Sequence, residues 1–417
     1  MYVTSLDRPH LKLSEYVNST LYLWNKYLST LHSSISNGKL KLGTGSLLYP
    51  NLALFTETKD HFILELLGAD EHFAGLKAFT HKYPSTVEYF GQFEGQKENP
   101  IFQLGARNSG LITLMLSSEI DLNAVKERFG FIADQWKTHL VRKGKNGALF
   151  SFSKTFQSFF INNCLVINRL DEIYRVKYIL YAEIISKGFP EEEYAGDLSK
   201  RLNKPAYSTS ELFGVHYIMD SAYHEYAISG QFANVFLVPE LRETRIGEFL
   251  RKHPSFICKA LNCRGYIYNK KFKWIEGNPN PEEENIQPDL MLEREDGSYD
   301  ICDLKTAIMR KARITKGQHC RRRFIDYVHE GTAQLANYSE YFKFKKNADW
   351  AWSRYKVRVN NPRLILIVGN YENAPREEIE EASRELKPNY QIIDYDTLNA
   401  FFLQKVRQNQ NENPQSS

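Results

Sequence analysis

The sequence predicts an α/β protein built from two regions, and three observations point to it. Short alternating apolar segments separated by Asn, Gly and Pro turns fill residues 1–120, which is a strand-rich pattern. Strand-like and helical segments alternate over residues 238–407, as in an α/β domain with a mixed central sheet. The 417 residues are 42% hydrophobic and 13% aromatic, which is enough to build sizeable cores.

Residues 1–237 are expected to form an α+β N-terminal region without a catalytic pattern, strand-rich over 1–120 and helical over 121–237. Alternation of apolar residues predicts the strands, and apolar spacing of three to four residues predicts the helices. The predicted strands are Lys39–Leu48, Leu52–Thr56 and Phe62–Leu67, and the predicted helices are Ile120–Val141, Cys164–Ser186 and Thr209–Asn234.

The second region begins with a helix over Glu240–Lys252 that His253-Pro254 should end. Two strand-like segments meet across Asp296-Gly297, which is a strong hairpin signal. The other predicted strands are Tyr266–Trp274, Arg363–Val368 and Tyr390–Tyr395, and the other predicted helices are Asp326–Phe344, Glu377–Leu386 and Asp396–Val406. The polar tail Gln408–Ser417 is expected to be disordered.

The composition excludes several classes of protein. No apolar run approaches the ~18 residues that a membrane span needs, and the first twelve residues lack the layout of a signal peptide. The five cysteines contain no Cys-x-x-Cys pair, which argues against a zinc ribbon or a disulfide framework. We therefore expect a cytoplasmic protein with no membrane partner.

The charge is distributed unevenly along the chain. Residues 1–237 carry 24 basic and 24 acidic side chains, whereas residues 238–417 carry 30 and 26, so the second region holds the whole net charge of +4. One stretch has eight bases and no acid: Lys305, Arg310, Lys311, Arg313, Lys316, Arg321, Arg322 and Arg323. Such a run is either a solvated face or a clamp for DNA phosphates.

The predicted hairpin carries the residues that suggest chemistry. Pro288-Asp289 opens its first strand, and Asp303-Leu304-Lys305 closes its second strand. Because side chains alternate along a strand, Asp303 and Lys305 project from one face, and Asp289 can reach Asp303 across the hairpin. Two carboxylates can hold Mg²⁺, which polarises a phosphodiester and lowers the pKa of bound water. The alternative is that these charges only protect an exposed strand.

Two helices can contribute further side chains. On the first helix, Glu243 lies at the edge of the apolar stripe and Glu248 lies on its far side, so we prefer Glu243 for the site. On the helix after the basic run, Gln334 shares a face with Tyr338 and Tyr341, where a polar residue suggests hydrogen bonding to a metal–water site. Either acid could instead be a solvent-facing helix residue.

Together these segments resemble the Shedu family of prokaryotic antiphage defence proteins, whose C-terminal domain is a PD-(D/E)XK nuclease. The resemblance rests on the helix Glu243–Pro254, on Pro288-Asp289, on Asp303-Leu304-Lys305 and on Gln334–Tyr338, and it covers about residues 238–405. It implies a restriction-endonuclease-like core, DNA cleavage dependent on Mg²⁺ or Mn²⁺, and assembly into homo-oligomers. By the same resemblance Glu243, Asp289, Asp303, Lys305 and Gln334 are the catalytic residues, with Asp289 and Asp303 holding the metal.

The leading hypothesis is a metal-dependent endonuclease acting on double-stranded DNA, with a regulatory N-terminal region. The alternative is a non-catalytic sensor of DNA ends or protein partners that keeps the nuclease fold. A phosphoesterase for small substrates is disfavoured by the basic run. Because one such site cuts one strand at a time, we expect a dimer or tetramer.

Overall fold

The computed structural model describes residues 11–43, 45–86, 103–106, 112–114, 136–138, 158–170, 173–203, 212–218, 224–237, 243–307, 313–317, 321–371 and 373–412. The chain divides into two compact units, Met1–Asn234 with Gln415–Ser417, and Val235–Pro414. Helices and mixed sheets occur in both units, which confirms the predicted α/β class.

A six-stranded mixed sheet organises the first unit. Its order is β4 (Lys77–Lys82), β2 (Leu52–Glu57), β3 (His61–Leu67), β9 (Ile173–Ser186), β8 (Ser158–Leu170) and β5 (Gln103–Ala106). The β2–β4 pair is parallel and the other pairs are antiparallel. Smaller pairs join β1 (Ser46–Leu48) to β10 (His216–Ile218) and β6 (Ile112–Leu114) to β7 (Trp136–Thr138).

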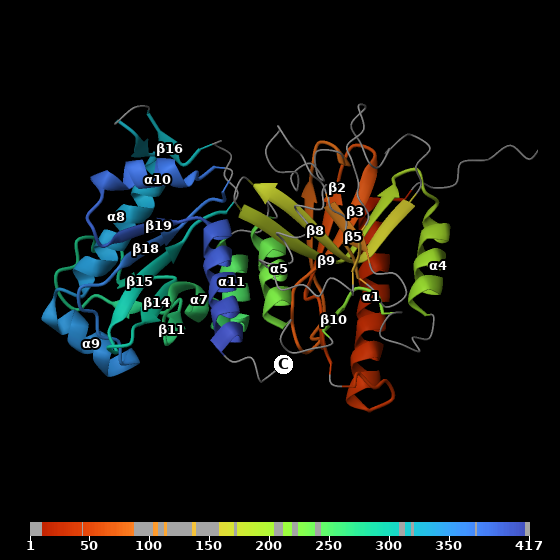
Figure 1. Ribbon diagram of the computed structural model, residues 1–417, viewed down its shortest axis with the longest axis horizontal. Helices are drawn as coiled ribbons and strands as arrows, with labels where there is room; N and C mark the ends of the chain where they lie inside the picture. The colour runs from red at the N-terminus through yellow and green to blue at the C-terminus, as the bar shows by residue number, and fades with distance from the viewer. Residues whose placement is uncertain are drawn as a thin grey trace, which may run out of the picture. The chain divides into compact units, whose positions relative to one another are not determined.

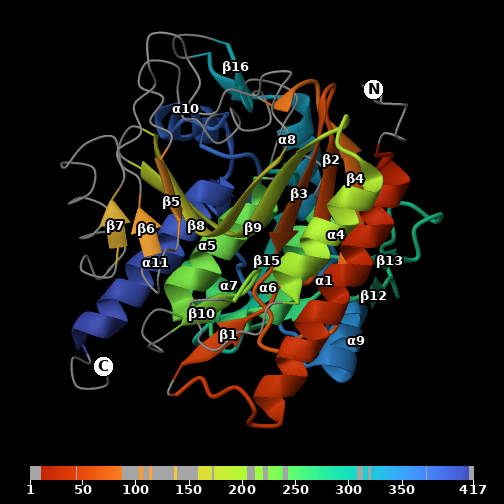
Figure 2. The same cartoon turned by 90° about the vertical axis from the view of Figure 1, so that its right-hand side faces the viewer.

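Helix α1 (Leu13–Ser36), which the sequence analysis did not predict, packs beside this sheet. Its buried residues Tyr16, Thr20, Trp24, Leu28 and Leu31 recur every three or four positions and so form one stripe. The Trp24 ring lies 4.6 Å from that of Tyr181 on β9. Figure 2 shows α1 and α4 (Glu191–Leu202) side by side, and the two helices are in contact.

The helix predicted over Cys164–Ser186 is wrong. The described residues of this range, 164–170 and 173–186, lie in β8 and β9, which pair from Ser158 with Ile185 to Leu170 with Ile173. Their Ile and Val residues fit a helical spacing, but β-branched side chains favour a strand wherever another strand is available to pair.

Two further helix predictions in this unit need correction. Thr209–Asn234 contains the strand β10 before the helix α5 (His224–Phe236), so only its second part is helical. Ile120–Val141 lies outside the described residues except at β7, which is a strand.

A five-stranded mixed sheet forms the centre of the second unit. Its order is β11 (Gly265–Tyr268), β14 (Leu290–Glu293), β15 (Tyr299–Leu304), β18 (Leu364–Ile367) and β19 (Tyr390–Ile393). The first three strands are antiparallel, and β15, β18 and β19 are parallel. The hairpin and the strands β18 and β19 confirm the sequence prediction, and all four residues of β18 are buried.

Helices cover both faces of this sheet. Figure 1 shows α8 (Asp326–Tyr341) on one side of β15 and β18, with α7 (Pro254–Leu261) and α11 (Tyr395–Glu412) on the other. Ile301, Leu364 and Leu366 join Val328 and Leu335 of α8 in one buried cluster. The helices α6 (Glu243–Lys252), α9 (Lys345–Tyr355) and α10 (Arg376–Ala382), with a 3₁₀ turn at Ser383–Glu385, complete the unit.

Some boundaries in this unit differ from prediction. The strand predicted over Tyr266–Trp274 breaks into β11 and β12 (Phe272–Lys273), because Asn269 adopts φ +51° between them. β12 then pairs with β13 (Asn285–Ile286), while β16 (Thr315–Lys316) pairs with β17 (Arg323–Phe324). The sequence analysis missed α7 and α9. Helix α11 continues to Glu412, so the prediction of disorder is wrong for residues 408–412.

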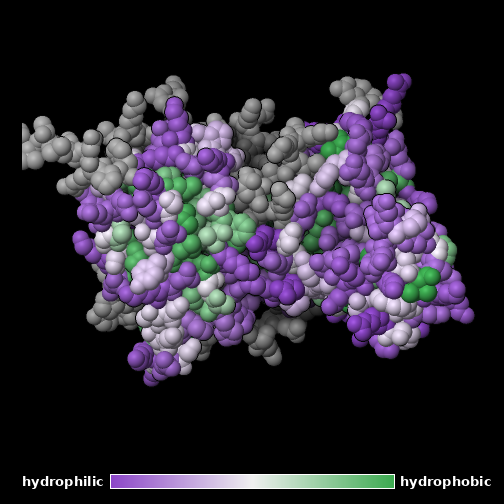
Figure 3. All heavy atoms as spheres, turned by 180° about the vertical axis from the view of Figure 1, so that it is seen from behind, coloured by the Kyte–Doolittle hydropathy of each residue, from purple (hydrophilic) through white to green (hydrophobic). Residues whose placement is uncertain are grey.

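The surface of the second unit is mostly hydrophilic on the face that Figure 3 shows at the right. Across the part of the chain that the structure describes, no helix is both long enough and apolar enough to cross a membrane.

Asn347 is fully buried and joins α9 to the loop after β12. Its Oδ1 accepts hydrogen bonds from the backbone N of Ile275 (2.8 Å) and of Glu276 (3.0 Å), and its Nδ2 donates to Glu276 O (2.9 Å). Asn347→Ala removes the hydrogen bonds to these backbone groups of Ile275 and Glu276 and should lower the free energy of unfolding by about 2–3 kcal/mol. Urea denaturation tests this, with the exposed Ser353→Ala on the same helix as a control. An equal loss of unfolding free energy in both variants would contradict the anchoring role of Asn347.

Candidate functional site

The pairing of β14 with β15 brings the two aspartates of the hairpin together. Leu290 lies opposite Cys302, so Asp289, one residue before β14, stands at the end of the hairpin where Asp303 lies. The backbone N of Leu304 donates a 2.8 Å hydrogen bond to Asp289 Oδ2, which holds this carboxylate against the second strand. The Asp303 side chain is only 3% exposed.

Lys305 reaches from the end of β15 back to Asp303 and across to α8. Its Nζ lies 2.6 Å from Asp303 Oδ2 and donates a 2.8 Å hydrogen bond to Gln334 Oε1. Its stem runs past Gly331, where an added Cβ would come within 3.4 Å of Lys305 Cε and 2.8 Å of Leu366 Cδ1. A glycine at this point therefore allows α8 to approach the sheet closely enough for Gln334 to reach the ammonium.

The backbone around Lys305 is also fixed on both sides. Its N–H donates to Ile367 O of the parallel strand β18 at 2.8 Å, and its carbonyl accepts a 2.7 Å hydrogen bond from Tyr395 OH. Tyr395 is fully buried at the start of α11. The sequence analysis missed this tyrosine, because no local spacing connects a residue ninety positions away with Lys305.

Gln334 is fixed in turn by its own helix. Its Nε2 donates to Tyr338 OH one turn later, and Tyr338 OH donates to Gln287 O at 3.2 Å, just before the Pro-Asp segment. Both ends of the Gln334 amide are thus occupied, with its oxygen directed to Lys305. The predicted shared face of Gln334 and Tyr338 is present.

Glu243 is the first residue of α6 and is half-buried. Its Oε1 accepts a 3.2 Å hydrogen bond from Tyr327 OH, which itself accepts one from Thr306 N at 3.3 Å. Tyr327, which the sequence analysis missed, thus links α6 to the residue after Lys305. Glu248 instead forms an ion pair with Arg245 at 2.5 Å on its own helix.

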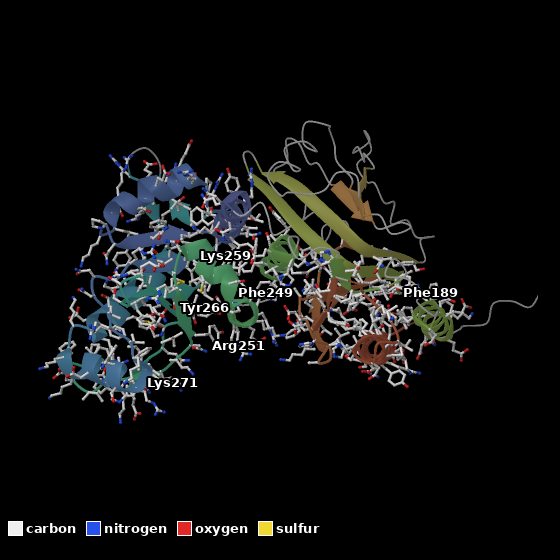
Figure 4. The ribbon with its side chains drawn as sticks, turned by 60° about the horizontal axis from the view of Figure 1, so that its bottom comes forward. Phe189, Phe249, Arg251, Lys259, Tyr266 and Lys271 are labelled. Carbon is white, nitrogen blue, oxygen red and sulfur yellow. The ribbon has the colours of Figure 1, made fainter. Side chains whose placement is uncertain are left out.

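Helix α6 lies close to the edge strand β11, which brings Glu243 into range of the hairpin. Tyr266 OH donates a 2.6 Å hydrogen bond to Leu250 O, and a Cβ at Gly247 would collide with the Tyr268 ring. Figure 4 shows Phe249 and Arg251 of α6 near Tyr266 of β11. The lack of a side chain at Gly247 therefore leaves room for the Tyr268 ring between this helix and the strand.

Burial and mutual repulsion change the protonation of the acids. Burial and the neighbouring charge of Asp303 raise the pKa of Asp289 to about 7. Burial also raises the pKa of Asp303, although the Lys305 ammonium opposes this shift and the charge of Glu243 adds to it. Such perturbed neighbouring carboxylates are typical of functional sites.

The same residues fit a hard divalent cation. Asp303 Oδ2 is buried and accepts no well-directed hydrogen bond from the described residues, although Lys305 Nζ is near. Two carboxylates that repel each other are suitable ligands for Mg²⁺, which takes its remaining ligands from water and substrate oxygens. Within the described ranges, no three His, Cys, Asp or Glu side chains are grouped to hold a metal ion. The described residues therefore supply a pair of acids rather than a complete metal cage.

The predicted basic run is only partly available for a ligand. Arg310 and Lys311 lie outside the described residues. Arg322 forms ion pairs with Glu378 (2.8 Å) and Glu381 (2.9 Å), and Lys316 pairs with Asp326 at 2.6 Å. The remaining described bases of the run, Arg313, Arg321 and Arg323, are exposed.

The fold and this site define the second unit as an α/β domain with a buried acid–lysine cluster at the end of a hairpin. Residues 240–399 match the family model described as Shedu protein SduA, C-terminal. The match confirms the resemblance to the Shedu family over these residues. No curated protein and no solved structure matches the chain.

The raised pKa of Asp289 has a consequence for stability in the presence of a chelator. Between pH 4 and 7 the unfolded chain loses this proton while the folded chain keeps it, so the free energy of unfolding should fall as the pH rises. The contribution of Asp289 is at most about 4 kcal/mol, at about 1.4 kcal/mol per pKa unit. The side chain in Asp289→Asn stays neutral, so this variant should lack the part of the fall in unfolding free energy that Asp289 causes.

Urea denaturation at several pH values between 4.5 and 8 measures the effect. The variant should gain stability relative to the natural chain as the pH increases and show a constant difference above pH 8. Subtracting the two curves removes titrating groups that do not interact with Asp289, such as Asp394, whose pKa burial raises to about 6. If the free energies of unfolding of the two proteins changed in parallel with pH, the raised pKa of Asp289 would be contradicted.

Proposed function

We propose that the chain is a metal-dependent DNA endonuclease that hydrolyses phosphodiester bonds in antiphage defence. The observation that carries this proposal is the buried Asp289–Asp303 pair with Lys305 at 2.6 Å and Gln334 behind the lysine. The Shedu match over residues 240–399 supports the role in defence. The proposed core is restriction-endonuclease-like, with a PD-(D/E)XK arrangement.

Each side chain of the cluster has a separate proposed role. Asp289 and Asp303 would hold Mg²⁺ or Mn²⁺, which when bound polarises the phosphodiester and activates water. Lys305, whose ammonium is the cation nearest to the two acids, stabilises negative charge that develops on the phosphate. Gln334 holds the ammonium in place, and Glu243 with Tyr327 closes the side of the site next to Asp303.

The partners of this proposed enzyme are double-stranded DNA and further copies of the chain. Exposed Arg313, Arg321 and Arg323 are available for phosphates, because no ion pair occupies them in the described part of the chain. A dimer or tetramer in the cytoplasm would place two sites on one duplex, and the first unit, which lacks such an acid–lysine cluster among its described residues, would regulate access.

A second candidate function is a non-catalytic sensor of DNA ends or partners. Two features favour it: the Lys305 ammonium already neutralises Asp303, and the described residues supply no third acidic, histidine or cysteine ligand. A sensor would bind DNA equally well with Mg²⁺ or with a chelator and would leave the DNA uncut.

Incubation of the purified chain with supercoiled and linear DNA, with Mg²⁺ or with chelator, separates the two functions. Cleavage should require Mg²⁺, and Asp303→Asn should reduce it by at least a hundredfold, because a ligand of the metal is lost. Lys305→Met should have a similar effect through the loss of a positive charge at the phosphate. Full activity in the Asp303 variant would rule out the proposed site.

The two acids of α6 provide a matched pair of variants. Glu243→Gln should lower the rate by at least tenfold, since Glu243 interacts with Tyr327 and with the charge of Asp303. Glu248→Gln should leave the rate within about twofold, because Glu248 pairs with Arg245. Equal losses of cleavage rate in both variants would show that the acids of α6 affect cleavage only through the folding of the protein.

DNA binding can be divided between the free and the paired bases of the run. Arg321→Ala with Arg323→Ala should weaken binding to every sequence and lower the log–log salt slope by about two, one for each lost phosphate contact. Arg322→Ala should mainly lower stability, because it removes the ion pairs with Glu378 and Glu381. Filter binding at several salt concentrations, with thermal melting of each variant, measures both effects. An unchanged slope in the double variant would show that the run is a solvated face.

A further inference from the structure

A second cluster of positive charge lies around the end of α9, and acids do not neutralise it. Between Lys343 and Arg363 the sequence has seven bases and a single acid, Asp349. Three of these bases have acidic partners, since Lys343 pairs with Glu340, Lys346 with Glu276 and Arg363 with Asp300. Arg354, Lys356 and Arg358 are exposed and form no ion pair within the described ranges.

An exposed tryptophan stands among these free bases. Trp352 of α9 is 46% exposed, whereas large aromatic side chains are mostly buried in this unit. The Arg358 guanidinium lies 4.9 Å and the Lys356 ammonium 5.5 Å from the centre of its ring. Cation–π attraction thus keeps two uncompensated cations beside a partly exposed aromatic ring.

The backbone fixes this arrangement. Lys356 ends α9 in the left-handed conformation, with φ +60°, and its N–H donates to Trp352 O at 3.0 Å. The chain therefore turns back, so that Lys356 and Arg358 both return to the Trp352 ring. Tyr355, the last residue of α9, donates from its OH to Lys271 O at 3.1 Å, so a further exposed base follows in the segment bound to this residue. We call Trp352, Arg354, Lys356, Arg358 and Lys271 the Trp352 surface.

The Trp352 surface is connected to the candidate site by a single strand. Tyr299 N, at the start of β15, donates to Arg358 O at 2.8 Å, and Asp303 and Lys305 lie at the other end of that strand. Six strand residues span roughly 20 Å at about 3.3 Å each. The Trp352 surface and the candidate site thus lie at opposite ends of β15.

We propose that the Trp352 surface binds unpaired nucleotides of the DNA substrate, with a base stacked on Trp352 and phosphates held by Arg358 and Lys356. Aromatic side chains with flanking bases are how proteins bind single strands without sequence preference. A base inside a duplex is covered by its neighbours and cannot stack on the indole, so the surface favours an overhang, a gap or an open end. The inference rests on the proposed DNA-directed function and adds the structure of the DNA that is recognised.

Fluorescence anisotropy with the full-length chain in chelator tests this inference without requiring cleavage. The probes are a labelled 20-base-pair blunt duplex and the same duplex with a ten-nucleotide single-stranded overhang. The natural chain should bind the overhang probe at least tenfold more tightly. Trp352→Ala should remove most of this preference, since one stacked base accounts for roughly tenfold in affinity or more.

Charge variants separate phosphate contacts from stacking. Lys356→Gln with Arg358→Gln should weaken binding of the overhang probe and lower its log–log salt slope by about 1.4, at roughly 0.7 for each single-strand phosphate. The control, Arg384→Gln with Lys387→Gln, removes the same charge from exposed positions next to α10 and should change neither quantity. Unchanged melting temperatures confirm that the variants are folded.

Several results would overturn the inference. Equal affinity for the two probes, or an unchanged preference in Trp352→Ala, would exclude base stacking at this surface. Variants that alter the oligomeric mass in light scattering but not the DNA affinity would show that the surface joins copies of the chain. If overhang binding depends on Trp352 but no DNA is cut with Mg²⁺, this inference stands and the proposed nuclease function fails.

Discussion

The antiparallel pairing of β14 with β15 is the constraint on which the candidate site depends. It places two carboxylates at one end of a hairpin that is buried on both faces, where water cannot screen their repulsion. The pKa of Asp289 consequently rises to about 7. The structure relieves this repulsion with one ammonium, that of Lys305, and a divalent cation would relieve it further.

The position of that ammonium depends on packing between the sheet and α8. Gly331 lets the helix approach β18, and this approach brings Gln334 within 2.8 Å of Lys305. Tyrosine hydroxyls complete the framework, since Tyr338, Tyr327 and Tyr395 each bond a different part of the site. The residues around the proposed chemistry are thus fixed by hydrogen bonds from α6, α8 and α11 at once.

Both basic segments of the second unit contain bases that pair with acids and bases that do not. In the run that ends at Arg323, Arg322 and Lys316 are occupied by acids of α10 and α8. Arg313, Arg321 and Arg323 of the same run, and Arg354, Lys356 and Arg358 around Trp352, are exposed and form no ion pair within the described part of the chain. Uncompensated cations attract phosphates most strongly, because no internal ion pair must first be broken.

The local sequence was sufficient to predict the hairpin, α6, β18 and the shared placement of Asp289, Asp303 and Lys305. Turn chemistry at Asp296-Gly297, strand alternation and the helical stripe around Glu243 all act over a few residues, so they can be recognised without the fold. The family resemblance rested on the same segments, and the match over residues 240–399 confirmed it.

Only the tertiary structure decided which partners these residues meet. Cys164–Ser186 is apolar enough for a helix, but its pairing as β8 and β9 depends on strands far away in the sequence. Tyr395 and Tyr327 reach the site from other helices, and Arg322 is neutralised by acids about sixty residues away. Local propensity determines which segments can form helices or strands, whereas long-range packing determines which charges are buried, paired or left free.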